Sequence, residues 1–232
     1  MRVAIIQSNY VPWKGYFDII GSVDLFVFYD DVQYTKRDWR NRNLIKTPRG
    51  VSWLTVPCGT GGRRLIHEVR LEDPSWQRRH WETLRQNYRE AAHWDHLAPL
   101  LEEFYLKQEW TSLSELNQAF IRRIARGYLG IETRFGDSRE HDLGHTKSRR
   151  LLGLLMKVGA TDYLTGPTAK AYLDEAAFDE AGVRVEYVSY DGYPEYRQLH
   201  GPFVHGVSIL DLLLNEGPRA AEFMKSRRFR SG

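Results

Sequence analysis

The chain has 232 residues, a formal net charge of +3 and one cysteine. The length suits one large domain, or one domain with an insertion, and a single cysteine excludes an intramolecular disulfide framework. The charge is too small to indicate nucleic-acid binding by itself, no apolar run is long enough to span a bilayer, and no signal-peptide pattern opens the chain, so we expect a soluble cytoplasmic protein.

The first elements in chain order have the pattern of a β-α-β unit. Residues 3–7 form a strand-like apolar run, and Pro12 suits the first turn of a helix because it lacks a backbone N–H. Residues 25–29 are almost entirely apolar, as in a strand buried on both faces. Open parallel sheets bind ligands beyond the carboxyl ends of their strands, and a helix start there offers N–H groups to an anion. We therefore expect a ligand site at the first loop.

The next region changes from hairpin to helix. Residues 44–47 and 51–56 flank a Pro-Arg-Gly turn and predict a β-hairpin. Asp73 followed by proline marks a helix start, and residues 112–115 match a capping box. No convincing strand occurs in this part of the sequence, so we place a helical insertion at residues 73–130.

The second half returns to alternating strands and helices. The expected strands are residues 133–136, 162–165 and 184–190, and the expected helices are residues 147–158, 168–178 and 208–215. Gly217-Pro218 ends the last helix. The order predicts an α/β fold, a Rossmann-like, mostly parallel sheet with a helical insertion, in a single domain of residues 1–232.

A first cluster of candidate site residues follows the first strand. It contains Gln7, Tyr10 and the run Trp13-Lys-Gly15-Tyr16. A glycine in a first helical turn costs up to about 1 kcal/mol relative to alanine, and a ligand or a backbone lying against its bare Cα is one reason to keep it. The alternative is that Gly15 packs on the sheet and that the aromatic side chains belong to the core.

A second cluster, residues 30–43, follows a buried strand. A carboxylate of Asp30 or Asp31 can act as a general base or bind an amine, and guanidinium groups bind phosphate or carboxylate in two-point fashion. Interleaved basic and aromatic residues also suit single-stranded nucleic acid, and the alternative without function is a solvated loop held by internal ion pairs. The candidate binding residues are Gln33, Lys36, Arg37, Arg40, Asn41 and Arg42.

The segment 141–150 is a third candidate. Its basic helix start can bind phosphate through Lys147 and either Arg149 or Arg150. The histidines at positions 141 and 145 lie on a loop, where a spacing of four does not ensure one face, so we predict no metal site. Cys58 lies in a glycine-rich loop, and because the sequence places no base beside it, we interpret it as incidental.

Motifs along nearly the whole chain are similar to those of the WbqC-like family of bacteria. They are Gln7-x-x-Tyr10-x-Pro12-Trp13-x-Gly15-Tyr16-Phe17, Asp30-Asp31-Val32-Gln33, Asn41-Arg42-Asn43, Lys147-Ser148-x-Arg150-Leu151, Gly159-Ala160-x-x-Tyr163-Leu164-x-Gly166, Tyr172-Leu173 and Ser208-Ile209-x-Asp211-Leu212-Leu213. The resemblance implies a role in surface-polysaccharide biosynthesis, with acyl or aminoacyl transfer onto an amino sugar suggested for some members. It carries no settled set of catalytic residues.

A more distant similarity is to the HIGH-type nucleotidyltransferases and pantothenate synthetase, and it implies a HUP-type version of the fold. In those enzymes an H-x-G-H segment lies under the nucleotide, and its histidines contact phosphate. Trp13 and Tyr16 occupy the two histidine positions here, which removes the groups that stabilise charge on the α-phosphate. The Lys147-Ser148-x-Arg150 motif resembles the later lysine-serine loop of the same enzymes.

Together these patterns predict a transferase that binds an activated or nucleotide-linked small molecule with a phosphate or carboxylate group. In this hypothesis Asp30 or Asp31 orients or deprotonates the attacking amine of an amino sugar, and Gln7 completes the catalytic set. The predicted substrate- and anion-binding residues are Tyr10, Pro12, Trp13, Gly15, Tyr16, Gln33, Lys36, Arg37, Arg40, Asn41, Arg42, Lys147, Ser148, Arg150 and Gly166.

Two alternatives stay open. A nucleotidyltransferase that forms an AMP or CMP adduct would use Mg²⁺, whereas the favoured reading requires no cofactor. An RNA- or tRNA-binding module would use residues 34–42 and the arginines at positions 78 and 79, with affinity that falls steeply with salt. Nucleic acid is the less favoured partner, and the sequence leaves a homo-oligomer open.

Overall fold

The central sheet of the computed structural model, which describes residues 1–144 and 147–226, has five parallel strands in the order β5-β2-β1-β6-β7. The strands are β1 (Arg2–Ile6), β2 (Leu25–Phe28), β5 (Arg134–Asp137), β6 (Asp162–Thr165) and β7 (Arg184–Tyr187). The strand order runs one way from β1 to β5 and the other way from β6 to β7, as in Rossmann-like sheets. The predicted α/β class is confirmed, and the order of strands reverses between β1 and β6.

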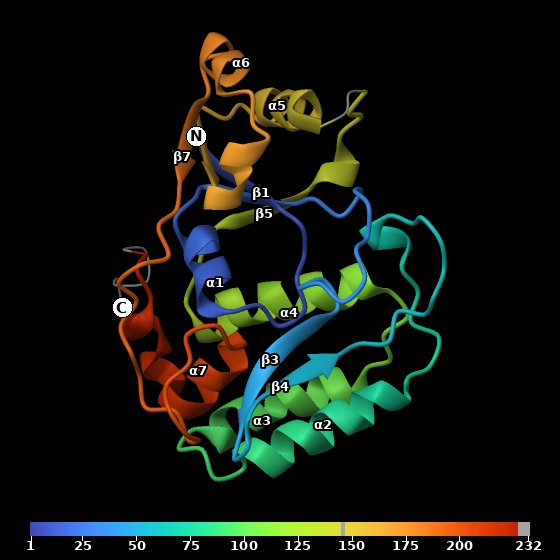
Figure 1. Ribbon diagram of the computed structural model, residues 1–232, viewed down its shortest axis with the longest axis vertical. Helices are drawn as coiled ribbons and strands as arrows, with labels where there is room; N and C mark the ends of the chain where they lie inside the picture. The colour runs from blue at the N-terminus through green and yellow to red at the C-terminus, as the bar shows by residue number, and fades with distance from the viewer. Residues whose placement is uncertain (145–146, 227–232) are drawn as a thin grey trace.

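Helices cover both faces of this sheet (Figure 1). α1 (Lys14–Gly21) and α4 (Leu113–Tyr128) lie on one face, and α5 (Lys147–Lys157) and α6 (Glu175–Glu180) lie on the other. Alternate strand residues face opposite sides. Ala4 therefore belongs to the core with α1 and α4, whereas Val3 belongs to the core with α5 and α6.

A second layer lies beyond α1 and α4 (Figure 1). It contains a two-stranded antiparallel hairpin and a group of helices. These are β3 (Arg42–Thr47), β4 (Gly50–Thr55), α2 (Ser75–Tyr88), α3 (Trp94–Glu102), a π-helix (Glu103–Lys107) and α7 (Ile209–Glu216). The predicted hairpin is confirmed, and Ser112 is the N-cap of α4, since its Oγ accepts from Glu115 N. Residues 75–128 contain α2, α3, the π-helix and α4.

Several boundaries differ from those predicted, most of them by one or two residues. The first helix begins at Lys14 rather than at Pro12, because the carbonyl of Pro12 accepts a hydrogen bond from Ile209 N at the start of α7. The helix expected over residues 168–178 is divided into a 3₁₀ turn (Pro167–Ala171) and α6, since Asp174 caps a new helix start. The strand expected over 184–190 ends at Tyr187.

In the part of the chain that the structure describes, four 3₁₀ turns complete the elements: Ile66–Glu68, Ser138–Glu140, Pro167–Ala171 and Gly217–Phe223. Within residues 1–144 and 147–226, no helix combines the length and the apolar character that crossing a membrane requires.

Candidate functional site

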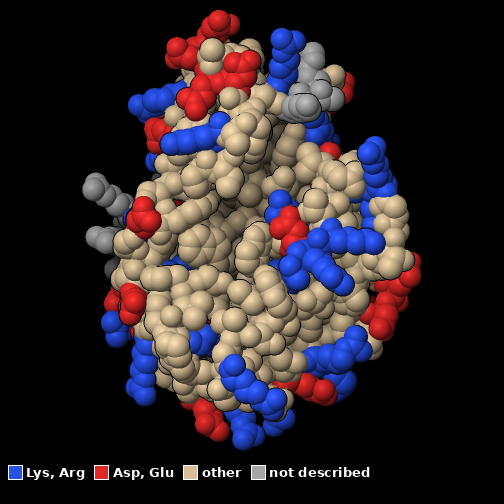
Figure 2. Space-filling view, in the orientation of Figure 1, with Lys and Arg blue, Asp and Glu red and all other residues tan. Residues whose placement is uncertain are grey.

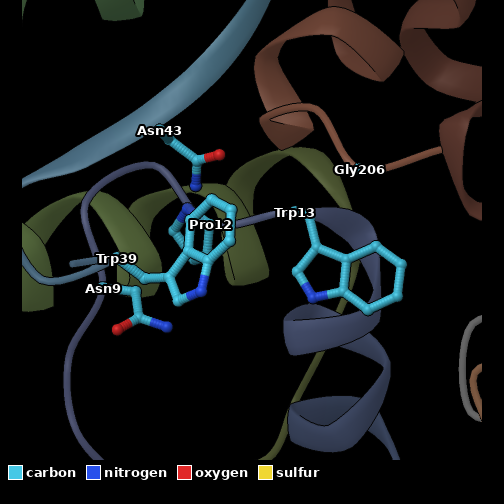
Figure 3. A pocket seen from close by; sticks show the side chains of 6 residues that line it. All are labelled: Asn9, Pro12, Trp13, Trp39, Asn43 and Gly206. Carbon is cyan, nitrogen blue, oxygen red and sulfur yellow. The ribbon is translucent and has the colours of Figure 1, made fainter. Parts of the chain in front are cut away.

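A pocket of about 240 Å³ lies beside the loop that follows β1. Two indoles, of Trp13 and Trp39, line it from different sides, together with Pro12 (Figure 3). Its lining residues are Asn9, Pro12, Trp13, Trp39, Asn43 and Gly206. The space-filling view shows the middle of this face hollowed, with uncharged walls and with basic and acidic side chains gathered at one edge (Figure 2). We call this cavity the Trp13–Trp39 pocket.

The indole of Trp13 is positioned by Gly15. A Cβ atom on Gly15 would lie 2.2 Å from a ring carbon of Trp13, so only glycine lets the indole fold over the first turn of α1. The ring also contacts Tyr190 and Tyr193, with centroids 5.1 and 5.6 Å away. The space beside the bare Cα is thus filled by a side chain of the same loop, rather than by the sheet or directly by a ligand.

The loop that holds Trp13 is strained and firmly tied. Val11 has a φ of 35°, in the left-handed region that β-branched residues avoid, at a cost of about 1–3 kcal/mol. Asn43 Nδ2 donates to the carbonyls of Tyr10 and Val11, each at 3.1 Å, and Ser208 Oγ donates to Val11 O at 2.7 Å. These bonds fix the loop before any ligand arrives, which reduces the entropy lost on binding.

Tyr10 supports this loop from inside the molecule. Its side chain is fully buried, and its hydroxyl lies 2.5 Å from Tyr105 Oη and 2.8 Å from His80 Nδ1. His80 Nε2 lies 3.2 Å from the carbonyl of Thr55, which can only accept, so Nε2 holds the proton and Nδ1 accepts from Tyr10. Burial lowers the pKa of His80 to about 4, which keeps it neutral. Tyr10 is therefore placed to support the pocket, not to line it.

Asp30 connects three segments: the loop after β1, the end of β2 and α4. Its side chain is fully buried; Oδ1 accepts from Ser8 N at 2.8 Å, and Oδ2 accepts from Ser114 Oγ at 2.5 Å and from Gln118 Nε2 at 3.1 Å. Its carbonyl accepts from both the backbone N–H and the Nδ1 of His67. The carboxylate thereby fixes the end of β2 to the loop after β1 and to α4.

Asp31 is the more accessible of the two acids. Its side chain forms an ion pair with Arg150 of α5 and accepts from Ser138 Oγ at 2.5 Å. Arg150 also donates to the hydroxyl of Tyr29 at 3.1 Å. The structure thus brings Asp31 and Arg150, far apart in the sequence, together at the carboxyl edge of the sheet.

Gln7 follows β1 and Gly166 follows β6, and these two neighbouring parallel strands are where the strand order reverses. The half-buried Gln7 side chain has no hydrogen-bond partner in the part of the chain that the structure describes, and Tyr16 Oη donates to its carbonyl at 3.0 Å.

Glycine at position 166 leaves room for a neighbouring hydroxyl. A Cβ atom there would lie 3.3 Å from Tyr190 Oη, which is tighter than an ordinary contact. Tyr190 in turn contacts Trp13, and therefore connects the end of β6 to one wall of the pocket.

Several other predicted residues contact neighbouring backbone or side chains. Arg40 Nη1 donates to Asn9 Oδ1 at 3.1 Å, next to the pocket. Three of the others donate to backbone carbonyls: Gln33 to Tyr34 O and Arg64 O, Lys36 to Thr60 O, and Asn41 to Val56 O. The hydroxyl of Ser148 accepts from Asp174 N. Arg37 is exposed, with a φ of 53°. Lys147 begins α5, but its side chain lies outside what the structure describes.

Lys14, between the two aromatic residues of the first motif, is not available to an anion. It is buried, donates to the carbonyl of Pro194 at 2.9 Å, and faces the rings of Tyr193, Tyr196 and Phe203. Burial lowers its pKa to about 8. The side chain instead attaches α1 to the segment that precedes α7.

Sequence reasoning missed four residues that line the pocket: Asn9, Trp39, Asn43 and Gly206. Trp39 and Asn43 belong to the segment that was singled out for its charges, and attention to its uncharged members would have found them. Asn9 sits inside the first motif. Gly206 lies in an irregular segment before α7, and no local pattern marks it.

Cys58 and a metal site are two features for which the sequence favours no functional role. Cys58 is buried, its thiol donates to Val56 O, and burial raises its pKa to about 11, so the nucleophilic thiolate is disfavoured. Within the described ranges, no group of three or more His, Cys, Asp or Glu residues is arranged to hold a metal ion. His145 lies outside those ranges.

Comparisons with known proteins give one family and one curated relative. The model of the WbqC-like protein family matches residues 7–223. The uncharacterized protein Rv1507c of Mycobacterium tuberculosis is 47% identical over 226 residues, which cover 97% of this chain and 97% of that protein. No solved structure matches significantly.

Proposed function

The chain belongs to the WbqC-like protein family, and we propose that it is a transferase that passes an acyl or aminoacyl group to an amino sugar used in surface-polysaccharide biosynthesis. The sugar ring occupies the Trp13–Trp39 pocket. The activated donor lies over the carboxyl ends of β1 and β6, where open α/β sheets bind their ligands.

The observation that carries this proposal is the chemistry of the pocket walls. Sugars present an apolar C–H face and a polar rim, and the two indoles that line the pocket offer flat apolar surfaces with a ring quadrupole. Asn9 supplies the polar complement: Arg40 holds its Oδ1, and its Nδ2 has no partner among the residues described. Two N–H groups are thus directed by a fixed side chain and left free for a ligand hydroxyl.

The residues at the sheet edge fit the transfer step. The amine nitrogen of the sugar attacks the carbonyl carbon of the activated acyl group, a C–N bond forms, and the bond from that carbon to the leaving group breaks. We assign removal of the amine proton to Asp31, which lies at the sheet edge with Arg150 beside it. Gln7, with its free carboxamide at the end of β1, orients the donor carbonyl. Asp30, with all of its contacts inside the protein, positions the loop.

The two residues that replace the histidines of the HIGH-type motif favour acyl transfer over nucleotidyl transfer. Trp13 is a pocket wall, and Tyr16 is buried with its hydroxyl on Gln7 O. Neither side chain is placed to give a positive charge to an α-phosphate. Burial raises the pKa of Tyr16 far above its usual value, so it stays a neutral hydroxyl.

A reconstituted assay tests the proposal. Purified protein is incubated with UDP-2-amino-2-deoxyglucose and other nucleotide-linked amino sugars, with acyl-thioester and aminoacyl donors, and N-acylated products are detected by mass spectrometry. We expect product with the wild type and at least a tenfold loss with Trp13→Leu. Trp81→Leu is the matched control, because Trp81 packs on Trp94 between α2 and α3 and does not line the pocket. Equal rates for both variants would contradict the assignment of the pocket.

A further inference from the structure

A strip of exposed aromatic surface extends outward from the Trp13–Trp39 pocket. Trp39 forms one wall of the pocket and is 44% exposed, and Trp53 of β4 is 43% exposed. Their rings are in contact, with centroids 5.5 Å apart and planes inclined by 44°. Large aromatic side chains are seldom left this open in pairs, and such a patch next to a pocket indicates a surface that a ligand covers.

Arg42 lies on the same strip. Its guanidinium carbon is 4.0 Å from the centroid of the Trp53 ring. Arg42 and Trp53 share the outer face of the hairpin, since Leu44, two residues after Arg42, is directly opposite Trp53. Trp53 in turn contacts Trp39, which lines the pocket. The guanidinium is therefore connected to the pocket wall through the two indoles.

The charge of Arg42 is not neutralised by a contact within the described residues. No carboxylate lies within 4.0 Å of it, and its half-buried side chain has a buried Nε without a hydrogen-bond partner. Asp38, the nearest acid in the sequence, is already engaged: it accepts from Thr35 Oγ1 and from Trp39 N, and Arg40 lies 3.7 Å away. The charge of Arg42 helps to lower the pKa of Asp38, but Arg42 forms no ion pair within 4.0 Å among the described residues, so its partly buried guanidinium can still contact a ligand.

We propose that Arg42, with the faces of Trp39 and Trp53, binds a phosphate group attached to the sugar whose ring occupies the Trp13–Trp39 pocket. A guanidinium fixed on an aromatic face keeps its N–H edge free for the two-point contact that phosphate oxygens accept. The exposed indoles of Trp39 and Trp53 pack against the chemical group that is linked to this phosphate. The inference rests on the proposed function for the identity of the ring, and it adds that the natural substrate is a phosphorylated sugar rather than a free one.

Calorimetric titration of three probes tests the inference: N-acetylglucosamine, its 1-phosphate, and UDP-N-acetylglucosamine. We expect the wild type to bind the two phosphorylated probes at least tenfold more tightly than the free sugar. Arg42→Gln should abolish that preference. Arg49→Gln is the matched control, since Arg49 is exposed at the tip of the same hairpin and about 20 Å along the strand from Arg42, at 3.3 Å per residue.

The outcomes separate the possibilities. If the sugar 1-phosphate binds as tightly as the UDP sugar, a single phosphate accounts for the gain in affinity. If the UDP sugar binds more tightly, the contact extends to the nucleotide. Equal effects of the two arginine variants, no preference for phosphate, or no binding by any probe at millimolar concentration would each overturn the inference.

The two proposals also fail separately. Phosphorylated sugars that bind through Arg42 without any acyl transfer would reject the proposed function alone. Acyl transfer at the same rate in the wild type and in Arg42→Gln, with saturating and with limiting acceptor, would reject the phosphate contact alone.

Discussion

The inner and the outer residues of the site differ in how completely their polar groups are satisfied. The inner support is the set of buried residues Tyr10, Asp30, Asn43 and His80, whose side chains bond to other parts of the protein. The outer surface is the set Trp39, Arg42 and Trp53, in which the two indoles are exposed and the half-buried Arg42 forms no ion pair within 4.0 Å among the described residues. The difference separates residues that hold the site from residues available to a ligand. Changes in the inner support should therefore cost stability, and changes in the outer surface should cost binding.

Asp30→Asn should give the largest loss of stability. The carboxylate accepts from Ser8 N, Ser114 Oγ and Gln118 Nε2, whereas an asparagine turns one acceptor into a donor that faces another donor. Hydrogen bonds to charged groups contribute about 1.5–3 kcal/mol each, and buried unsatisfied donors cost about 1–3 kcal/mol. We expect the free energy of unfolding, measured by urea titration, to fall by about 3 kcal/mol.

The same chemical change at Asp179 is the control, because that residue is exposed on α6 and its side chain has no partner among the residues described. Asp179→Asn should change the free energy of unfolding by less than about 0.5 kcal/mol. Equal losses for the two variants would show that Asp30 does not belong to the inner support. If Asp30→Asn kept full stability but lost transfer activity, Asp30 would have the catalytic role that the sequence predicts.

His80 should make stability depend on pH. Its pKa is lowered by burial to about 4, against an ordinary value of 6.5. Between these values the unfolded chain binds a proton that the folded protein does not, so stability is complete above pH 6.5 and is lost as the pH falls towards 4. At 1.36 kcal/mol per unit, the full effect is roughly 3 kcal/mol.

The measurement compares the wild type with His80→Asn in urea titrations from pH 7.5 to pH 4.5. The loss of stability that belongs to His80, obtained as the difference between the two proteins, should reach about 2 kcal/mol at the lower limit. A constant difference across this range would mean that His80 is already protonated or not buried in the folded protein. In that case the Tyr10 hydroxyl would need another acceptor.

The sequence predicted the fold class and a candidate site after β1 because the signals for both are local along the chain. The order of strands follows from apolar runs and turn residues, and the loop after β1 follows from its position in that order. Whether an acid is buried or exposed depends instead on elements distant in the chain. Asp30 and Asp31 are neighbours with the same side chain, yet Ser114 and Gln118 of α4 enclose one, whereas Arg150 of α5 pairs with the other.

The Trp13–Trp39 pocket was harder to predict for the same reason. Gly15 is an unusual residue for a first helical turn, and the reason is the Trp13 side chain, which folds back over it. Trp39 reaches the pocket only because its carbonyl accepts from Tyr10 N, 29 positions away in the sequence. Such contacts depend on tertiary packing, which no periodicity encodes.

Gly15→Ala probes the boundary between the inner and outer residues. The new methyl group must displace the Trp13 indole, 2.2 Å away, at a cost of about 1–3 kcal/mol for overpacking, and the higher helix propensity of alanine offsets about 1 kcal/mol. We expect stability to fall by about 1 kcal/mol and affinity for N-acetylglucosamine 1-phosphate to fall at least tenfold. Unchanged affinity would mean that the position of the Trp13 indole does not shape the pocket.

Trp53→Ala should affect stability least and so test the outer surface most directly. The ring is 43% exposed, and its contacts are with Trp39 and the Arg42 guanidinium. Exposed cation–π contacts contribute about 0.5–1 kcal/mol, so the free energy of unfolding should change by no more than about 1 kcal/mol. Without the ring, Arg42 gains rotamer freedom that a bound phosphate must remove again, so affinity for the 1-phosphate should fall while affinity for the free sugar, measured in parallel, stays within twofold. A loss of stability as large as that of Asp30→Asn would place Trp53 with the inner support and remove the distinction between the two sets.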